Sequence, residues 1–98
     1  MSAAGFVTIV HPGAEDVHPS LALAPRLSTL AGARIALIDN AKHMAGVFLA
    51  ELGRELQERH GVATLEVYRK ANASIPTPTD VLSRLSQSCD GLVHGVAD

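Results

Sequence analysis

The sequence predicts an α/β fold, a three-layer β-α-β-α-β unit with parallel strands in the order 2-1-3, resembling half of a Rossmann-like or flavodoxin-like domain. Short apolar runs lie at residues 34–39, 63–68 and 92–96. The stretches between them carry helical signals, and the connections are short. Because crossovers between parallel strands are right-handed, the two helices are expected to cover the faces of the sheet.

Residues 1–33 are predicted to form an N-terminal extension, and residues 34–98 the βαβαβ core. Within the extension, the β-branched run Phe6 to Val10 is interpreted as a short strand, because a turn-forming His-Pro-Gly follows it. The segment that ends at Pro25 is expected to be irregular, since its prolines break helices.

The run Arg34 to Asp39 is apolar up to its last residue, which is typical of a strand buried on both faces of a parallel sheet. A helix is expected to follow at once, with Asn40 as its N-cap and Gly61 as its C-terminal stop. Apolar residues recur at helical spacing in this stretch and form one stripe. They are Ala45, Phe48, Leu49, Leu52 and Leu56.

A second strand is predicted from Ala63 to Tyr68. The residues 77–80, Thr-Pro-Thr-Asp, have the form of a capping box with Pro78 at the first helical position, so a second helix should begin there. This helix is expected to end near residues 89–91. The third strand then covers residues 92–96 and buries His94 as an interior imidazole.

Composition argues against several classes of function. The net charge of −2 and three aromatic residues (one Tyr, two Phe) disfavour a nucleic-acid partner, which needs a basic surface and stacking side chains. No apolar run reaches the length of a membrane span and no signal peptide is evident, so a cytoplasmic location is expected.

The single cysteine, Cys89, allows no internal disulfide and is expected to pack as a small hydrophobe. The five histidines lack zinc-like spacing, and no glycine-rich phosphate loop follows the first strand, so we expect neither a metal nor another cofactor.

Polar residues gather where the three predicted strands end, and ligands of open α/β sheets bind at that edge. One interpretation is a polar pocket beside a helix N-terminus, which would favour an anion. In the other, Asn40 only caps the helix, while Arg69 and Lys70 are solvated charges. Lys42 is expected in the first helical turn, where the dipole disfavours a cation, and this conflict indicates a ligand role. The candidate pocket residues are Asp39, Asn40, Lys42, Arg69, Lys70, Ser74 and Asp98.

Several segments share the order and spacing of one known family. They are residues 23–27 (LAPRL), 30–32 (LAG), 35–42 (IALIDNAK), 59–62 (RHGV), 69–76 (RKANASIP) and 89–98 (CDGLVHGVAD). From about Leu23 onward the chain thereby resembles the N-terminal part of the UGSC-motif (seleno)protein family. In that family a Gly-Val-Ala/Gly-Asp turn, matched here by residues 95–98, is followed directly by Sec-Gly-Ser-Cys or Cys-Gly-Ser-Cys.

The resemblance implies a redox protein in which a selenocysteine or cysteine follows Asp98 and acts on a small-molecule or thiol substrate. A selenolate or thiolate at a helix N-terminus is a good nucleophile. Asp39, Asn40, Lys42 and Asp98 would line its turn, and orient the substrate or tune the chalcogen. On this hypothesis the reading frame was closed at a UGA codon, and the 98 residues are an inactive fragment of an incomplete domain. A natural stop or a deliberately shortened chain is the alternative.

Two further classes of function stay open. The chain is also consistent with a small α/β module that binds an anion or another ligand at the helix N-terminus after Asn40. It is equally consistent with an interaction domain that forms homo-oligomers, because an uncovered edge of the third strand offers unpaired backbone groups to another chain.

Overall fold

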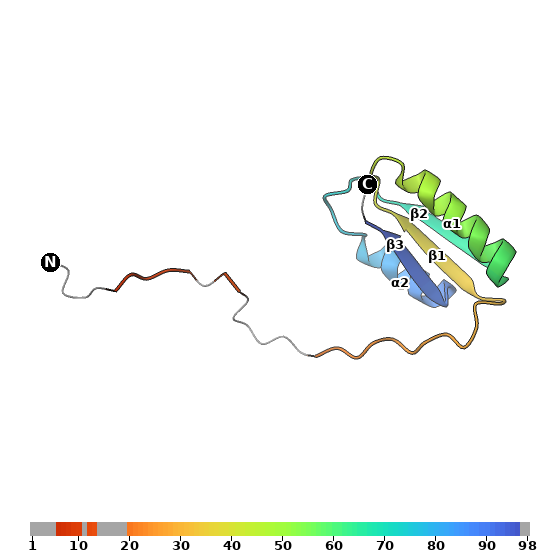
Figure 1. Cartoon of the computed structure of the whole chain (residues 1–98), viewed down its shortest axis with the longest axis horizontal. Coiled ribbons are helices and arrows are strands. Elements are labelled where there is room, and N and C mark those ends of the chain that lie inside the picture. Colours follow the sequence, from red (N-terminus) through yellow and green to blue (C-terminus); the bar gives the residue numbers. More distant parts are fainter. Residues whose placement is uncertain (1–5, 11, 14–19, 97–98) are drawn as a thin grey trace.

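Three strands and two helices follow one another in strict alternation (Figure 1). The structure is a computed structural model that describes residues 6–10, 12–13 and 20–96. The elements are β1 (Arg34–Asp39), α1 (Ala45–His60), β2 (Thr64–Arg69), α2 (Thr79–Ser88) and β3 (Gly91–Gly95).

β1 lies at the centre of the sheet, with β2 on one side and β3 on the other, both parallel to it. The predicted strand order 2-1-3 is confirmed. Asp39 lies opposite Arg69 of β2 and Gly95 of β3, so all three strands end at one edge of the sheet. β2 and β3 are each displaced by one residue from their predicted bounds.

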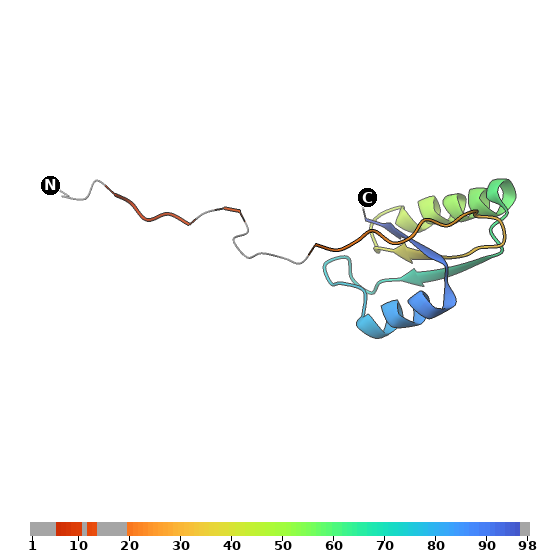
Figure 2. The same cartoon turned by 90° about the horizontal axis from the view of Figure 1, so that it is seen from below.

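The two helices cover opposite faces of the sheet (Figure 2). Side chains of a strand point alternately to its two faces, so β1 contributes to two separate hydrophobic clusters. Ile35 and Leu37 pack in the cluster beneath α1, and Ala36 and Ile38 pack with Leu85 of α2. These four β1 residues are at most 4 % exposed, as the continuous apolar run predicts.

The predicted start of the first helix is wrong. α1 begins at Ala45, and Met44, not Asn40, holds the N-cap position in a left-handed conformation with φ 64°. The predicted stop is confirmed, because Gly61 follows α1 with φ 69°, a conformation that favours glycine.

The apolar stripe of α1 is confirmed in part. Ala45 and Leu49 are buried, and Leu56 packs against the cluster beneath the helix. Phe48, in contrast, is 63 % exposed. Gly53 lies on the buried face of α1 instead. A Cβ at this position would lie only 2.7 Å from Leu65 Cδ1, so glycine allows the helix to approach β2 closely.

The capping box predicted for the second helix does not form. Pro78 holds the N-cap position, the helix begins one residue later at Thr79, and no side-chain hydrogen bond from the described residues caps it. Leu85 and Val81 face the sheet, whereas Leu82 is 43 % exposed. The end of α2 at Ser88 agrees with the prediction.

The N-terminal segment does not form the predicted strand. Residues 6–10 belong to no strand and are exposed, and residues 20–29 are exposed without helix or strand. Leu27 lies beside Gly91 of β3, and Leu30 and Ala33 pack in the cluster beneath α1. The amide of Gly32 also donates to the Gly61 carbonyl at 2.8 Å. The interior position predicted for His94 is wrong as well, because that residue is exposed on β3.

Candidate functional site

Buried polar residues gather at the edge where the three strands end. Asp39 and Asn40 lie at the end of β1 and are 3 % and 5 % exposed. Lys70 follows β2 directly and is 6 % exposed. The amide of Lys70 donates to the Asp39 carbonyl at 2.9 Å, which fixes the two strand ends side by side.

Asn40 connects the ends of all three strands. Its Nδ2 donates to the backbone carbonyl of Val96, the residue after β3, at 3.0 Å. Its Oδ1 accepts a hydrogen bond from Lys70 Nζ at 2.7 Å. We call this arrangement of Lys70 Nζ, the Asn40 amide and the Val96 carbonyl the edge bridge. The prediction that Asn40 caps the helix is wrong, because both polar atoms of its side chain serve the edge bridge.

Lys70 is a buried cation held by neutral oxygens. Besides Asn40, its Nζ donates to the Ala73 carbonyl at 3.3 Å, within the loop that follows β2. The interpretation of Lys70 as a solvated charge is therefore wrong. An ammonium has three N–H donors, and the described residues accept from two of them. Removing the acceptor at Asn40 would leave this buried charge poorly compensated.

The Asp39 carboxylate holds the start of the loop between β1 and α1. Its Oδ1 accepts from the amide of Ala41 at 2.8 Å, and its Oδ2 lies 3.5 Å from Nη1 of Arg69. Arg69 itself is largely exposed, with 65 % of its side chain in contact with solvent. A Cβ at Gly46 would lie 3.0 Å from Oδ2, so glycine leaves room for the carboxylate beneath α1.

The loop between β1 and α1 is strained. Ala41 and Met44 adopt left-handed backbone conformations, with φ 60° and 64°. Such conformations in non-glycine residues cost about 1–3 kcal/mol and occur preferentially at functional sites. Between them lies Lys42, which is half-buried and precedes the helix instead of occupying its first turn as predicted. Its ammonium hydrogen-bonds to none of the described residues.

The other candidate residues are placed less centrally. Ser74 is exposed, and its amide donates to the Asn72 side chain at 2.8 Å. Asp98 lies outside the described residues. The structure thus brings Asp39, Asn40 and Lys70 together. The Val96 carbonyl of the edge bridge and the Ala73 carbonyl, which also accepts from Lys70, were missed, because no sequence pattern marks a carbonyl as an acceptor.

A second polar cluster lies on the α2 face of the sheet. Glu66 of β2 accepts from Ser88 Oγ at 2.9 Å and from Cys89 Sγ at 3.5 Å, and it forms an ion pair with Arg84. The hydrogen bond from Ser88, supported by Cys89 and Arg84, lowers the pKa of Glu66. Cys89 also packs against the buried Leu85 cluster, as the sequence predicts. Among the described residues, no group of His, Cys, Asp and Glu side chains could hold a metal ion.

A family comparison bears on this geometry. The model of the UGSC family matches residues 8–98, nearly the whole chain. The protein belongs to the UGSC family. The match includes residues of the exposed N-terminal segment as well as all the strands and helices. No curated protein and no solved structure matches the chain. No helix in the part of this UGSC-family chain that the structure describes is long and apolar enough to cross a membrane.

Proposed function

We propose that this chain is the N-terminal part of a selenol- or thiol-dependent redox protein, and that the edge bridge holds its reactive segment in place. The proposal rests on membership of the UGSC family and on the motif that the sequence resemblance implies after the turn at residues 95–98. The observation that carries it is the hydrogen bond from Asn40 to the Val96 carbonyl. It anchors the backbone three residues before the position at which the motif would begin.

The proposed reaction is a thiol–disulfide exchange. The selenolate or thiolate of the first motif residue attacks a substrate disulfide, which forms a mixed bond and releases one substrate thiolate. The cysteine thiolate of the motif then attacks the mixed bond, releases the second substrate thiolate and closes an internal Se–S or S–S bond. The substrate gains two electrons and the protein loses two. An external dithiol restores the reduced pair. A cytoplasmic location, part of the same proposal, would supply such thiols.

Within this proposal, Lys42 favours the ionised nucleophile. A cation near a thiol or selenol lowers its pKa. Lys42 has no hydrogen-bond partner among the described residues and lies in the strained loop beside the edge bridge. Lys70, in contrast, already donates to Asn40 and Ala73, so its role is to position the backbone.

The nucleotide sequence beyond the Asp98 codon gives the first test. We expect UGA or a cysteine codon, followed in frame by codons for Gly-Ser-Cys. A UAA or UAG codon, or the lack of an in-frame Gly-Ser-Cys, would contradict the proposal.

A kinetic test uses the protein that carries the motif. Lys42→Ala should lower the rate of disulfide reduction at neutral pH by roughly threefold to tenfold, because the nucleophile is less ionised. The rate should recover as the pH rises, and the melting temperature should stay unchanged. Arg26→Ala, which removes an exposed cation from the N-terminal segment, is the matched control and should have no effect. Unchanged kinetics in Lys42→Ala would remove that residue from the site.

The sequence also predicts an anion- or ligand-binding module as the alternative function. That alternative requires inorganic phosphate to raise the melting temperature of the 98-residue chain, and the increase to be lost in Lys42→Ala. The redox proposal expects no such stabilisation, so one thermal titration distinguishes the two functions.

A further inference from the structure

The two outer strands of the sheet differ in charge. β2 carries Glu66, which pairs with Arg84, and Arg69, which pairs with Asp39. β3 has the sequence Gly-Leu-Val-His-Gly and contains no Asp, Glu, Lys or Arg. Charged residues on an edge strand oppose pairing with another chain, and β3 lacks this protection.

The backbone groups of β3 that face outward can be identified. The Asp39 carbonyl accepts from the amide of Lys70, so the odd-numbered residues of β1 direct their backbone groups to β2 and the even-numbered residues direct theirs to β3. Backbone groups alternate in direction along a strand. Ala36 lies opposite Leu92, so Ala36 bonds to the backbone of Gly91 and Val93. Leu92 and His94 therefore direct their N–H and C=O groups away from β1.

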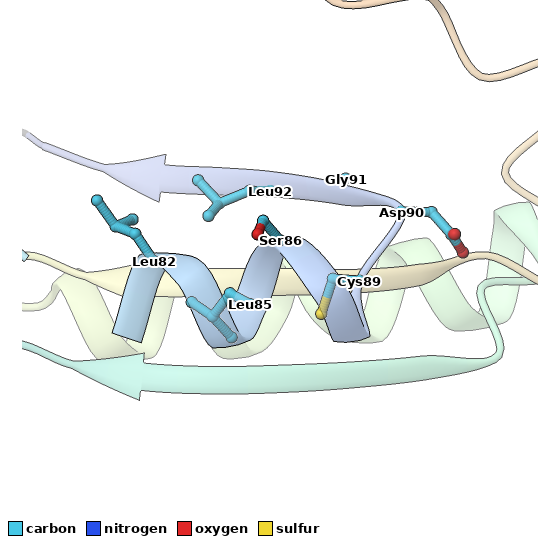
Figure 3. A pocket seen from close by; sticks show the side chains of 7 residues that line it. All are labelled: Leu82, Leu85, Ser86, Cys89, Asp90, Gly91 and Leu92. Atoms are coloured by element: carbon cyan, nitrogen blue, oxygen red, sulfur yellow. The ribbon is translucent and has the colours of Figure 1, made fainter. Parts of the chain in front are cut away.

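An open groove borders this edge on the α2 face (Figure 3). Its volume is about 430 Å³, and Leu82 of α2 and Leu92 of β3 point toward each other across it. These two leucines are 43 % and 46 % exposed. Cys89 and Leu85 line its inner side. A chain that paired with β3 would therefore also cover apolar surface.

From these observations we infer that β3 pairs with β3 of a second copy in an antiparallel homodimer. A two-fold axis at Val93 places the outward-facing residues opposite one another, Leu92 against His94 of the second copy and His94 against Leu92. These two pairs would make on the order of four intermolecular hydrogen bonds. The partner is a second copy because the strand is complementary to itself in this register, with no like charges face to face. The inference does not depend on the proposed redox function.

The same register brings Leu92 opposite His94 of the second copy on the α2 face. His94 is exposed, so a change there should leave the monomer folded. Each substitution changes two contacts of the dimer, because the two-fold axis repeats every contact. His94→Glu places charge beside the apolar groove and brings the two introduced carboxylates near each other across the axis.

Sedimentation equilibrium of the 98-residue chain over a wide concentration range tests the inference. We expect a monomer–dimer equilibrium whose dissociation constant increases at least about tenfold in His94→Glu. Val67→Glu, at a position of the β2 edge that is 64 % exposed, is the matched control and should leave it unchanged. A monomer at every concentration would overturn the inference. So would a dimer that resists His94→Glu, or one that Val67→Glu weakens equally.

Disulfide formation between copies tests the register even if His94→Glu fails to fold. In the Cys89→Ser background, Leu92→Cys and His94→Cys are purified separately and then mixed. Directly opposed residues in antiparallel strands have Cβ atoms about 4.5–5.5 Å apart, within reach of a disulfide. The mixture should cross-link faster than either variant alone. Equal rates in all three samples would refute the register.

Discussion

Replacing Asn40 by alanine should strongly destabilise the protein. The charge-assisted hydrogen bond from Lys70 Nζ to Asn40 Oδ1 is 2.7 Å long, and such bonds contribute about 1.5–3 kcal/mol. The bond to the Val96 carbonyl, at 3.0 Å, adds about 1 kcal/mol. Asn40→Ala should therefore lower the free energy of unfolding by about 3 kcal/mol, a large part of the 5–15 kcal/mol typical of a whole domain.

A double-mutant cycle separates the edge bridge from a general packing effect. Lys70→Met removes the charge along with its hydrogen bonds and should cost about 1–2 kcal/mol, because the group left unpaired at Asn40 is neutral. In that background Asn40→Ala should cost only about 1 kcal/mol. Urea denaturation of the four proteins gives the coupling energy, which we expect to be about 2 kcal/mol, the difference between the two costs of Asn40→Ala. The control is Asn72→Ala, which removes one exposed turn hydrogen bond and should cost at most about 0.5 kcal/mol. Additivity within about 0.5 kcal/mol would refute the reasoning.

Three further measurements test the fold. The side-chain hydrogen bond from Arg34 lowers the pKa of Asp90, so the unfolded chain binds protons more readily and stability should fall as the pH drops below about 4. In Asp90→Asn the urea midpoint should depend less on pH in this range; an unchanged dependence would contradict the assignment. Gly61→Ala should cost about 1 kcal/mol in urea denaturation because of the left-handed backbone, and no loss would argue against that conformation. Leu85→Ala should cost about 2–5 kcal/mol, since this side chain is 1 % exposed, and a smaller loss would place it outside the core.

The sheet could be predicted because its signals are local and agree with one another. Arg34 to Asp39 forms a continuous apolar run, and a strand with helices on both faces requires such a run. Gly61 stops the helix through its own backbone freedom. A run that is apolar on both faces also favours the central position for this strand, and right-handed crossovers then place the two helices on opposite faces of the sheet.

The edge bridge could not be predicted, because its partners meet through tertiary structure. Asn40 has a strong local preference for capping a helix. Its amide nevertheless donates to the carbonyl of Val96, which lies 56 residues further along the chain. Lysine is rarely buried, but the Asn40 side chain and the Ala73 carbonyl accept hydrogen bonds from the buried ammonium of Lys70. Local preferences were outweighed at both positions by acceptors that only the folded chain supplies.

The central place of β1 also determines how the molecule can come apart. Among the described elements, β1 is the strand to which both other strands bond, and its side chains belong to both hydrophobic clusters. If β1 unfolded, β2 and β3 would lose their paired strand and each helix would lose the strand surface on which it packs. We therefore expect neither half of the sheet to stay folded without β1. The slowest amide hydrogen exchange is therefore expected at Ile35 to Ile38, at a rate set by global unfolding of the core.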